Sequence, residues 1–233
     1  GALRDVDVAA TQTLPLWTER YVAGDASRAP AWLALQTALL DAAQQQRTAV
    51  RQTLAQPAVG AALLYLGRID DARAHYDEMW PGLERSLLLM VHLTRAEAWF
   101  MRGSIAVAWS ARSSHDTSAS VQARVARRAV KLLLGEASAF ARGLGASLAA
   151  VQDRLAGQSE RAQEQLARAE AAFLDAAMPA HVAAVRWSVA RMGRDDAAAA
   201  TEEARLVESG IVRPRRFVAV LIGAHDLADP AAR

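Results

Sequence analysis

The sequence predicts an all-α fold made of antiparallel helical hairpins, and three features of the chain support this prediction. Hydrophobic residues make up 52% of the 233 residues and charged residues 22%, a composition typical of a folded chain rather than a disordered one. Alanine, leucine and arginine dominate, whereas the β-branched and aromatic residues that favour strands are sparse. No segment of useful length alternates between apolar and polar residues, so we expect no β-sheet.

The best-defined helix of the sequence follows Gly67. Its apolar residues recur at intervals of three and four, which places them on one face of an α-helix. Another helix precedes Gly67, and glycine commonly supplies the left-handed turn that ends a helix. We expect the second helix to stop at Trp80-Pro81, because proline disfavours helix interiors. The apolar face consists of Ile69, Ala72, Tyr76, Met79 and Leu83.

Two carboxylates and a histidine lie on a different face of the same helix. Asp71, His75 and Glu78 are four and three residues apart, a spacing at which they could meet a metal ion. A metal site also needs ligands from elsewhere in the chain, and the sequence indicates none. Charged residues on an outer helical face are usually solvated. We therefore expect no metal site and no cofactor.

Two glycines are followed by the same pattern, a small residue five positions later and apolar residues nine and twelve positions later. This pattern resembles the second half of a tetratricopeptide repeat, in which small residues let the two helices of a hairpin approach closely. Copies after Gly24 and Gly193 are degenerate and the spacing is irregular, so the resemblance implies an irregular tetratricopeptide-like (TPR-like) solenoid. The residues are Ala72, Tyr76 and Met79 after Gly67, and Ala162, Leu166 and Ala169 after Gly157.

The rest of the chain divides at a serine-rich polar segment. We expect one long helix from Leu83 to Arg112 before this segment and a helix after it that breaks at Gly143 and Gly145. The expected parts are N-terminal helical hairpins at 1–112, a polar linker or inter-helix loop at 113–120, C-terminal TPR-like hairpins at 121–228 and a frayed tail at 229–233.

A family resemblance begins at Trp80, in the run WPGLERSLLLMVHLTRAEA. From there the chain resembles the C-terminal helical-repeat region of large bacterial Hanks-type serine/threonine protein kinases. The residues that carry the resemblance are Trp80, Pro81, Leu83, Arg85, Ser86, Leu87, Leu88 and Arg95, and near the end Gly210, Ile211, Pro214, Arg216 and Val220-Leu221-Ile222. The resemblance implies a regulatory segment, and because the chain begins at Gly1 without an initiator methionine, we expect it to be part of a longer protein.

The kinase domain itself is not predicted within this chain. RGLGASL, at residues 142–148, lacks the third glycine of a phosphate-binding loop, and the single lysine, Lys131, lies in a helical run. The sequence contains no His-Arg-Asp, no Asp-Phe-Gly, no metal-binding His-Glu-x-x-His and no cysteine. We therefore expect no catalytic residues and no enzymatic activity in this segment.

A partner-binding groove is the site that a helical solenoid predicts, lined by the first helix of each hairpin. Trp and Arg are frequent among residues that dominate binding energy, so a Trp–Arg pair one helical turn apart is a candidate contact. The alternative is that this tryptophan belongs to the core and the arginine ends its helix near Gly193. The predicted groove residues are Tyr65, Val151, Arg154, Trp187 and Arg191.

A basic run is the other candidate binding surface. Arg124, Arg127, Arg128 and Lys131 lie on one side of a helix and could bind phosphates or an acidic partner helix. No aromatic residues that could stack on bases are interleaved with them, so we expect no nucleic-acid binding. A solvated face is the plainer interpretation of this run.

Together these patterns favour a non-catalytic protein-interaction or regulatory module. We expect a protein or peptide partner, with the module's own kinase domain as one candidate. The alternative is a helical sensor domain that binds a small effector in an apolar pocket. The most apolar run, residues 86–94, is too short to span a membrane, so we expect a cytoplasmic protein without membrane association.

Overall fold

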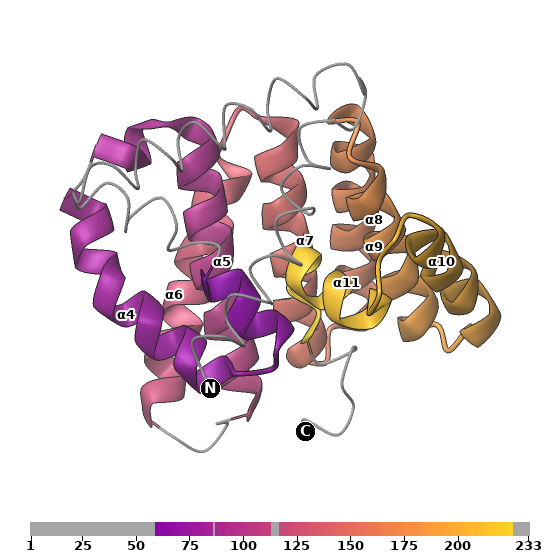
Figure 1. Ribbon diagram of the computed structural model, residues 1–233, viewed down its shortest axis with the longest axis horizontal. Coiled ribbons are helices and arrows are strands. Elements are labelled where there is room, and N and C mark those ends of the chain that lie inside the picture. The colour runs from indigo at the N-terminus through magenta and orange to yellow at the C-terminus, as the bar shows by residue number, and fades with distance from the viewer. Residues whose placement is uncertain (1–58, 86, 113–116, 226–233) are drawn as a thin grey trace. The chain divides into compact units, whose positions relative to one another are not determined.

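The computed structural model describes residues 59–85, 87–112 and 117–225 (Figure 1). Every regular element in these ranges is a helix and none is a strand, which confirms the predicted all-α class. The chain forms two compact units, Gly1–Val91 and His92–Arg233. The boundary between the units lies inside the predicted N-terminal part, residues 1–112.

In the first unit, a helical segment at 59–65 is followed by a turn at Gly67 and by α4 (Ile69–Arg85). Gly67 has a φ of 76°, the left-handed conformation expected of a glycine that ends a helix. Tyr76 on α4 packs so closely on Gly60 that a Cβ there would overlap its ring. The buried face of α4 consists of Ile69, Ala72, Tyr76, Trp80 and Leu83.

The predicted end of this helix at Trp80-Pro81 is wrong. α4 continues to Arg85 with Pro81 inside it, and the Arg85 side chain donates a hydrogen bond to the Pro81 carbonyl at 2.9 Å. Trp80 and Leu83 are buried on the same face of the helix. This burial stabilises the last turn and offsets the loss of the backbone hydrogen bond that Pro81 cannot donate.

The predicted long helix from Leu83 to Arg112 is also interrupted. After α4, the short 3₁₀-helix η2 (Leu87–Met90) precedes α5 (His92–Arg112), which opens the second unit. Met90 and Val91 are exposed, so a continuous helix would bury little apolar surface at this point. The Val91 amide bonds instead to the Leu88 carbonyl three residues earlier, at 3.1 Å.

The second unit is a series of helices in which each packs on the next, and α5 also packs on α7. α11 packs on α9, α10 and α7. Residues 113–116 and 229–233 of the predicted linker and tail, and the repeat copy at Gly24, lie outside the described residues. After α5 the helices are α6 (Thr117–Leu134), α7 (Ala139–Leu155), α8 (Ser159–Asp175), α9 (Pro179–Met192), α10 (Asp196–Glu208) and α11 (Pro214–Ile222).

Glycines inside helices set the spacing of this unit, and the predicted break at Gly143 and Gly145 is wrong because both lie within α7. A Cβ at Gly143 would lie 2.6 Å from Cε1 of Phe173 on α8, and one at Gly145 would lie 3.0 Å from the Leu134 backbone nitrogen on α6. Glycine in a helix costs about 1 kcal/mol relative to alanine. The free energy gained by burying apolar surface at these close contacts outweighs that cost.

Gly103→Ala tests this packing, because a Cβ at Gly103 on α5 would lie 2.7 Å from the Ala129 Cβ on α6 and would also overlap Leu148 on α7. We expect overpacking of about 1–3 kcal/mol to exceed the roughly 1 kcal/mol gain in helix propensity. The free energy of unfolding, measured in urea by circular dichroism, should fall.

Gly193→Ala is the matched control in the same unit. Its φ is −77°, and a new Cβ would find its nearest neighbour at an ordinary 3.5 Å. Its stability should be unchanged or should rise by a few tenths of a kcal/mol. Equal effects of the two substitutions would contradict a glycine-dependent approach of α5, α6 and α7.

Candidate functional site

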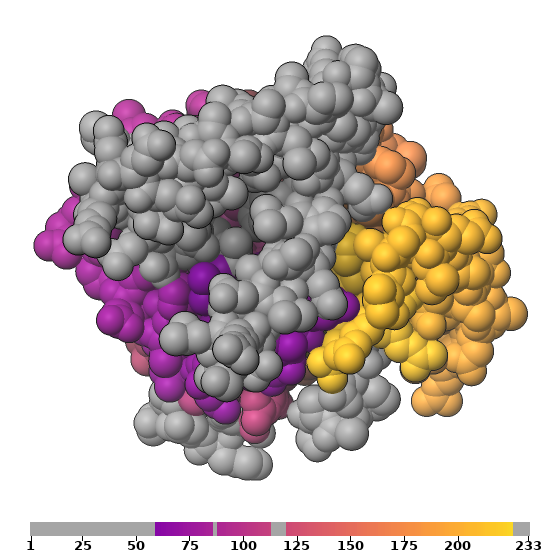
Figure 2. Space-filling view, in the orientation of Figure 1, coloured from indigo at the N-terminus to yellow at the C-terminus, as the bar shows by residue number. Residues whose placement is uncertain are grey.

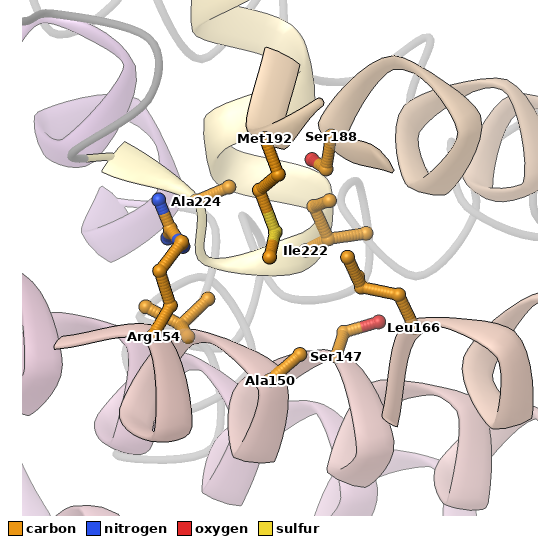
Figure 3. Close-up of a pocket in the computed structure, with 9 residues that line it drawn as sticks. Ser147, Ala150, Arg154, Leu166, Ser188, Met192, Ile222 and Ala224 are labelled. Carbon is orange, nitrogen blue, oxygen red and sulfur yellow. The ribbon is translucent and has the colours of Figure 1, made fainter. Parts of the chain in front are cut away.

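A small cavity in the second unit is the candidate site (Figure 3). It lies among α7, α8, α9 and α11, and its volume is about 10 Å³, room for about one water molecule. Pockets for drug-sized ligands are larger, about 300–1,000 Å³. The lining residues are Ser147, Ala150, Val151, Arg154, Leu166, Ser188, Met192, Ile222 and Ala224.

Helical spacing brings these side chains together. Ser147, Val151 and Arg154 on α7 are four and three residues apart, so they lie on one face of that helix. Ser188 and Met192 are four residues apart on α9 in the same way. In the close-up, the Arg154 side chain extends from α7 toward Ala224, at the far edge of the cavity (Figure 3).

Two serine hydroxyls line this otherwise apolar cavity. Ser147 donates a hydrogen bond to the Gly143 carbonyl of its own helix at 2.9 Å. Ser188 is 1% exposed, and its hydroxyl has no hydrogen-bond partner among the described residues. A buried hydroxyl without a partner costs roughly 1–3 kcal/mol, so a bound group that hydrogen-bonds to Ser188 would recover part of that energy.

α11 closes one side of the cavity. Its six residues from Phe217 to Ile222 are all buried, so this part of the helix is covered on every side. The helix ends at Gly223, which has a φ of 74° and lies against Ser104 of α5 and Leu148 of α7. The start of α11 and the loop before it form part of the surface beside α10, shown in yellow in Figure 2.

A shared carboxylate connects α9, α10 and α11. Oε1 of Glu203 on α10 accepts hydrogen bonds from the Trp187 indole nitrogen on α9, at 2.8 Å, and from Arg215 Nε on α11, at 2.9 Å. Trp187 is 0% exposed. Its hydrogen bond and its burial place it in the core between these helices.

The predicted groove residues lie in different environments. Val151 and Arg154 line the cavity. Trp187 is enclosed in the core, and Arg191 lies over its ring, 6.0 Å from the centroid, and pairs with Asp196 at 2.7 Å. Tyr65 is buried in the first unit, whereas the cavity residues belong to the second unit.

Sequence reasoning missed Ser188 and Met192, which lie one residue after Trp187 and Arg191. Successive residues of an α-helix are about 100° apart around its axis. The side of α9 that faces the cavity is therefore rotated by about 100° from the side that carries Trp187 and Arg191. Trp187 is enclosed between α9, α10 and α11, whereas Ser188 faces the cavity.

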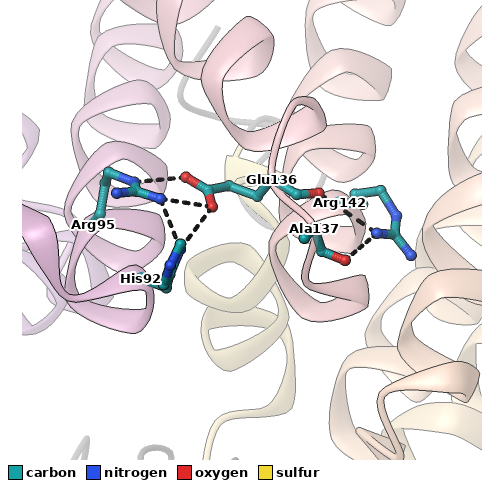
Figure 4. A network of polar contacts seen from close by, with 5 residues as sticks. All are labelled: His92, Arg95, Glu136, Ala137 and Arg142. Atoms are coloured by element: carbon teal, nitrogen blue, oxygen red, sulfur yellow. Dashed lines mark hydrogen bonds and ion pairs between the residues drawn. The ribbon is translucent and has the colours of Figure 1, made fainter.

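A polar network fixes the start of α7 (Figure 4). Glu136, in the turn after α6, accepts hydrogen bonds from Nε and an Nη of Arg95 on α5, at 2.6 and 2.9 Å. These bonds lower the pKa of the Glu136 carboxyl and raise that of Arg95. Nδ1 of His92 lies 2.8 Å from Arg95 and 3.3 Å from Glu136, and Arg142 donates to the Ala137 carbonyl.

This network connects the turn after α6 to α5. Glu136 is held in a two-point ion pair with Arg95, which favours its ionised form. Within the described ranges no group of three or more His, Asp or Glu side chains could hold a metal ion. No helix of the part that the structure describes is both long and apolar enough to cross a membrane.

Comparisons with protein-family models, with curated proteins and with solved structures find no match to this chain.

A double-mutant cycle of Arg95→Gln and Glu136→Gln should give a coupling energy of about 1–3 kcal/mol at pH 7, because the bond is charge-assisted and its carboxylate is only 12% exposed. The pKa of Glu136 is lower in the folded state than its ordinary 4.5, so this coupling should be lost as the pH falls through the folded-state value. Urea unfolding of the four proteins of the cycle, at pH 7 and at acidic pH, measures the coupling energy. A coupling energy near zero at pH 7 would contradict a stabilising role of the ion pair.

His225, just after the cavity residue Ala224, predicts a second pH dependence. Burial lowers the pKa of His225 from 6.5 to about 4, so between these values the unfolded state binds more protons than the folded state. Stability should be complete above pH 6.5 and should fall by up to about 1.4 kcal/mol per pH unit down to about pH 4. His225→Gln should flatten the profile of unfolding free energy over this interval, and an unchanged slope would contradict the assignment.

Proposed function

We propose that this chain is a non-catalytic protein-interaction module that binds a peptide or helical segment of a partner on the face shared by α7 and α9. One observation carries the proposal: this face already holds a helical segment, α11. Six consecutive residues of α11 are buried, and its end contributes Ile222 to the cavity between α7 and α9. A surface that buries one apolar helix has the shape and the apolar character to bind another in a groove.

The order of helix contacts supports a TPR-like solenoid as the architecture. If α5/α6, α7/α8 and α9/α10 are hairpins, then α7 and α9 are first helices, which line the inner side of such arrays. α5 packs on α7 and α9 packs on α11, as successive first helices do in a solenoid. The small-residue pattern after Gly157 agrees with this architecture, because Ala162 and Ala169 on α8 are completely buried.

We propose further that the module is the regulatory C-terminal part of a bacterial Hanks-type serine/threonine kinase. The support is the sequence resemblance that begins at Trp80. On this proposal the partner is another cytoplasmic protein or the module's own kinase domain, and the module acts by positioning its partner without bond chemistry.

The size of the cavity favours a protein partner over a small effector. A volume of about 10 Å³ is far too small for a drug-sized molecule, whereas a partner can contact the side chains around the cavity without entering it. The Arg154 side chain lies at the edge of the same cavity.

Photo-crosslinking tests this function. Benzoylphenylalanine replaces Met192, which lines the cavity, or, in a matched control, Leu174, which is 58% exposed at the end of α8. We expect the chain with the probe at 192 to capture a defined partner covalently from a lysate and the chain with the probe at 174 to capture none.

Circular dichroism verifies that both labelled chains keep the helicity of the unmodified protein. Equal capture from both positions would contradict a binding site at the cavity. Absence of capture from position 192 in a correctly folded chain would contradict the interaction module itself.

A further inference from the structure

We propose that the exposed face of α6 binds an acidic helical segment of a partner protein. This basic face consists of Arg124, Arg127, Arg128 and Lys131, all of which are exposed. The four residues follow one another at intervals of three, one and three, and α6 contains no acidic residue. They form a cationic stripe along about 10 Å of the helix axis, at about 1.5 Å per residue.

The stripe lies on the side of α6 opposite to its packed side. The residues of α6 that are buried are Gln122, Ala126, Ala129 and Leu133. At about 100° per residue, these four cluster around one direction of the helix, and the four cations cluster around the opposite direction. The packing of α6 in the second unit therefore leaves the whole stripe at the surface.

Among the described residues these charges have no carboxylate partner, unlike several other surface arginines of the chain. Arg68, Arg186, Arg191 and Arg215 each form an ion pair of 2.6–2.9 Å with a carboxylate. None of the four stripe residues forms an ion pair within the part of the chain that the structure describes. α6 carries these four positive charges and no negative one, so its own net charge is +4. Its exposed face is therefore a local region of positive potential.

One cation of the stripe is held in position by an aromatic ring. The Arg128 guanidinium carbon lies 5.0 Å from the centroid of the Trp99 ring on α5. This cation–π contact restricts the side chain before binding, which lowers the entropy cost of forming an ion pair. Trp99 itself is 5% exposed, so it is not available to stack on a nucleic-acid base.

The surroundings of the stripe favour a protein helix as its ligand. Leu132 and Leu134, which are 39% and 42% exposed, flank the stripe and offer apolar contact beside the charges. A helix with glutamates at intervals of three and four presents carboxylates with the same repeat as the cations. Charge complementarity would set the register, and the flanking leucines would add apolar burial.

Fluorescence anisotropy with a labelled helical peptide tests this inference. The probe is an alanine- and leucine-based peptide of about 18 residues with glutamates at intervals of three and four, and its reference has glutamine at the same positions. We expect the full chain to bind the glutamate peptide at least about tenfold more tightly than the glutamine peptide, and more weakly as NaCl rises from about 50 to about 300 mM.

The decisive comparison uses two variants with the same change in net charge. Arg127→Glu with Lys131→Glu reverses two of the four charges of the stripe, whereas Arg161→Glu with Arg168→Glu changes exposed residues of α8. The first variant should lose about tenfold in affinity and the second less than about twofold. Arg127→Gln with Lys131→Gln should give an intermediate loss, and serves in place of the first variant if that one loses helicity.

Three results would overturn the proposal. The first is an equal loss of affinity in the α6 and α8 variants, which would show a general charge effect. The second is binding of the glutamate and glutamine peptides with the same affinity. The third is displacement of the peptide by an RNA oligonucleotide or by phosphatidylserine vesicles at lower concentrations than an unlabelled copy of the peptide, which would assign the stripe to a different class of ligand.

Discussion

The close approach of α5, α6, α7 and α8 is the constraint on which the second unit depends. Gly103, Gly143 and Gly145 lie where neighbouring helices leave no room for a Cβ. Glycine weakens an isolated helix, so its presence inside α5 and α7 is favourable only because these helices pack on others. Apolar burial at these contacts supplies the free energy that local propensity lacks.

The central position of α7 connects this packing to the candidate site. Gly143 of α7 lies against Phe173 of α8 and Gly145 lies against α6, while Val151 and Arg154, further along α7, line the cavity. The Arg95–Glu136 ion pair fixes the turn that leads into α7. The helix that forms one wall of the cavity is therefore held at its start and along its packed side, which suits a preorganised binding surface.

Charge is distributed unevenly over the second unit. Around α9, α10 and α11, arginines pair with carboxylates, and Glu203 links Trp187 to Arg215. On α6 the cations have no carboxylate within its own sequence. The paired charges contribute to the arrangement of the helices, whereas the charges of α6 are available to a partner. The cavity and the basic face of α6 are thus separate surfaces with different chemistry.

The sequence by itself determined the all-helical class, the turns at Gly67 and Gly157, and the apolar face of α4 except that Trp80 is buried there in place of the predicted Met79, because these features depend on composition, on local backbone conformation and on helical periodicity. It also predicted Val151 and Arg154 as groove residues, and both line the cavity. Only the tertiary structure decided that Gly143 and Gly145 lie inside a helix, that Pro81 does not end α4, and that Ser188 rather than Trp187 faces the cavity. Each of these outcomes depends on burial against residues distant in sequence, a free-energy term that no local pattern contains.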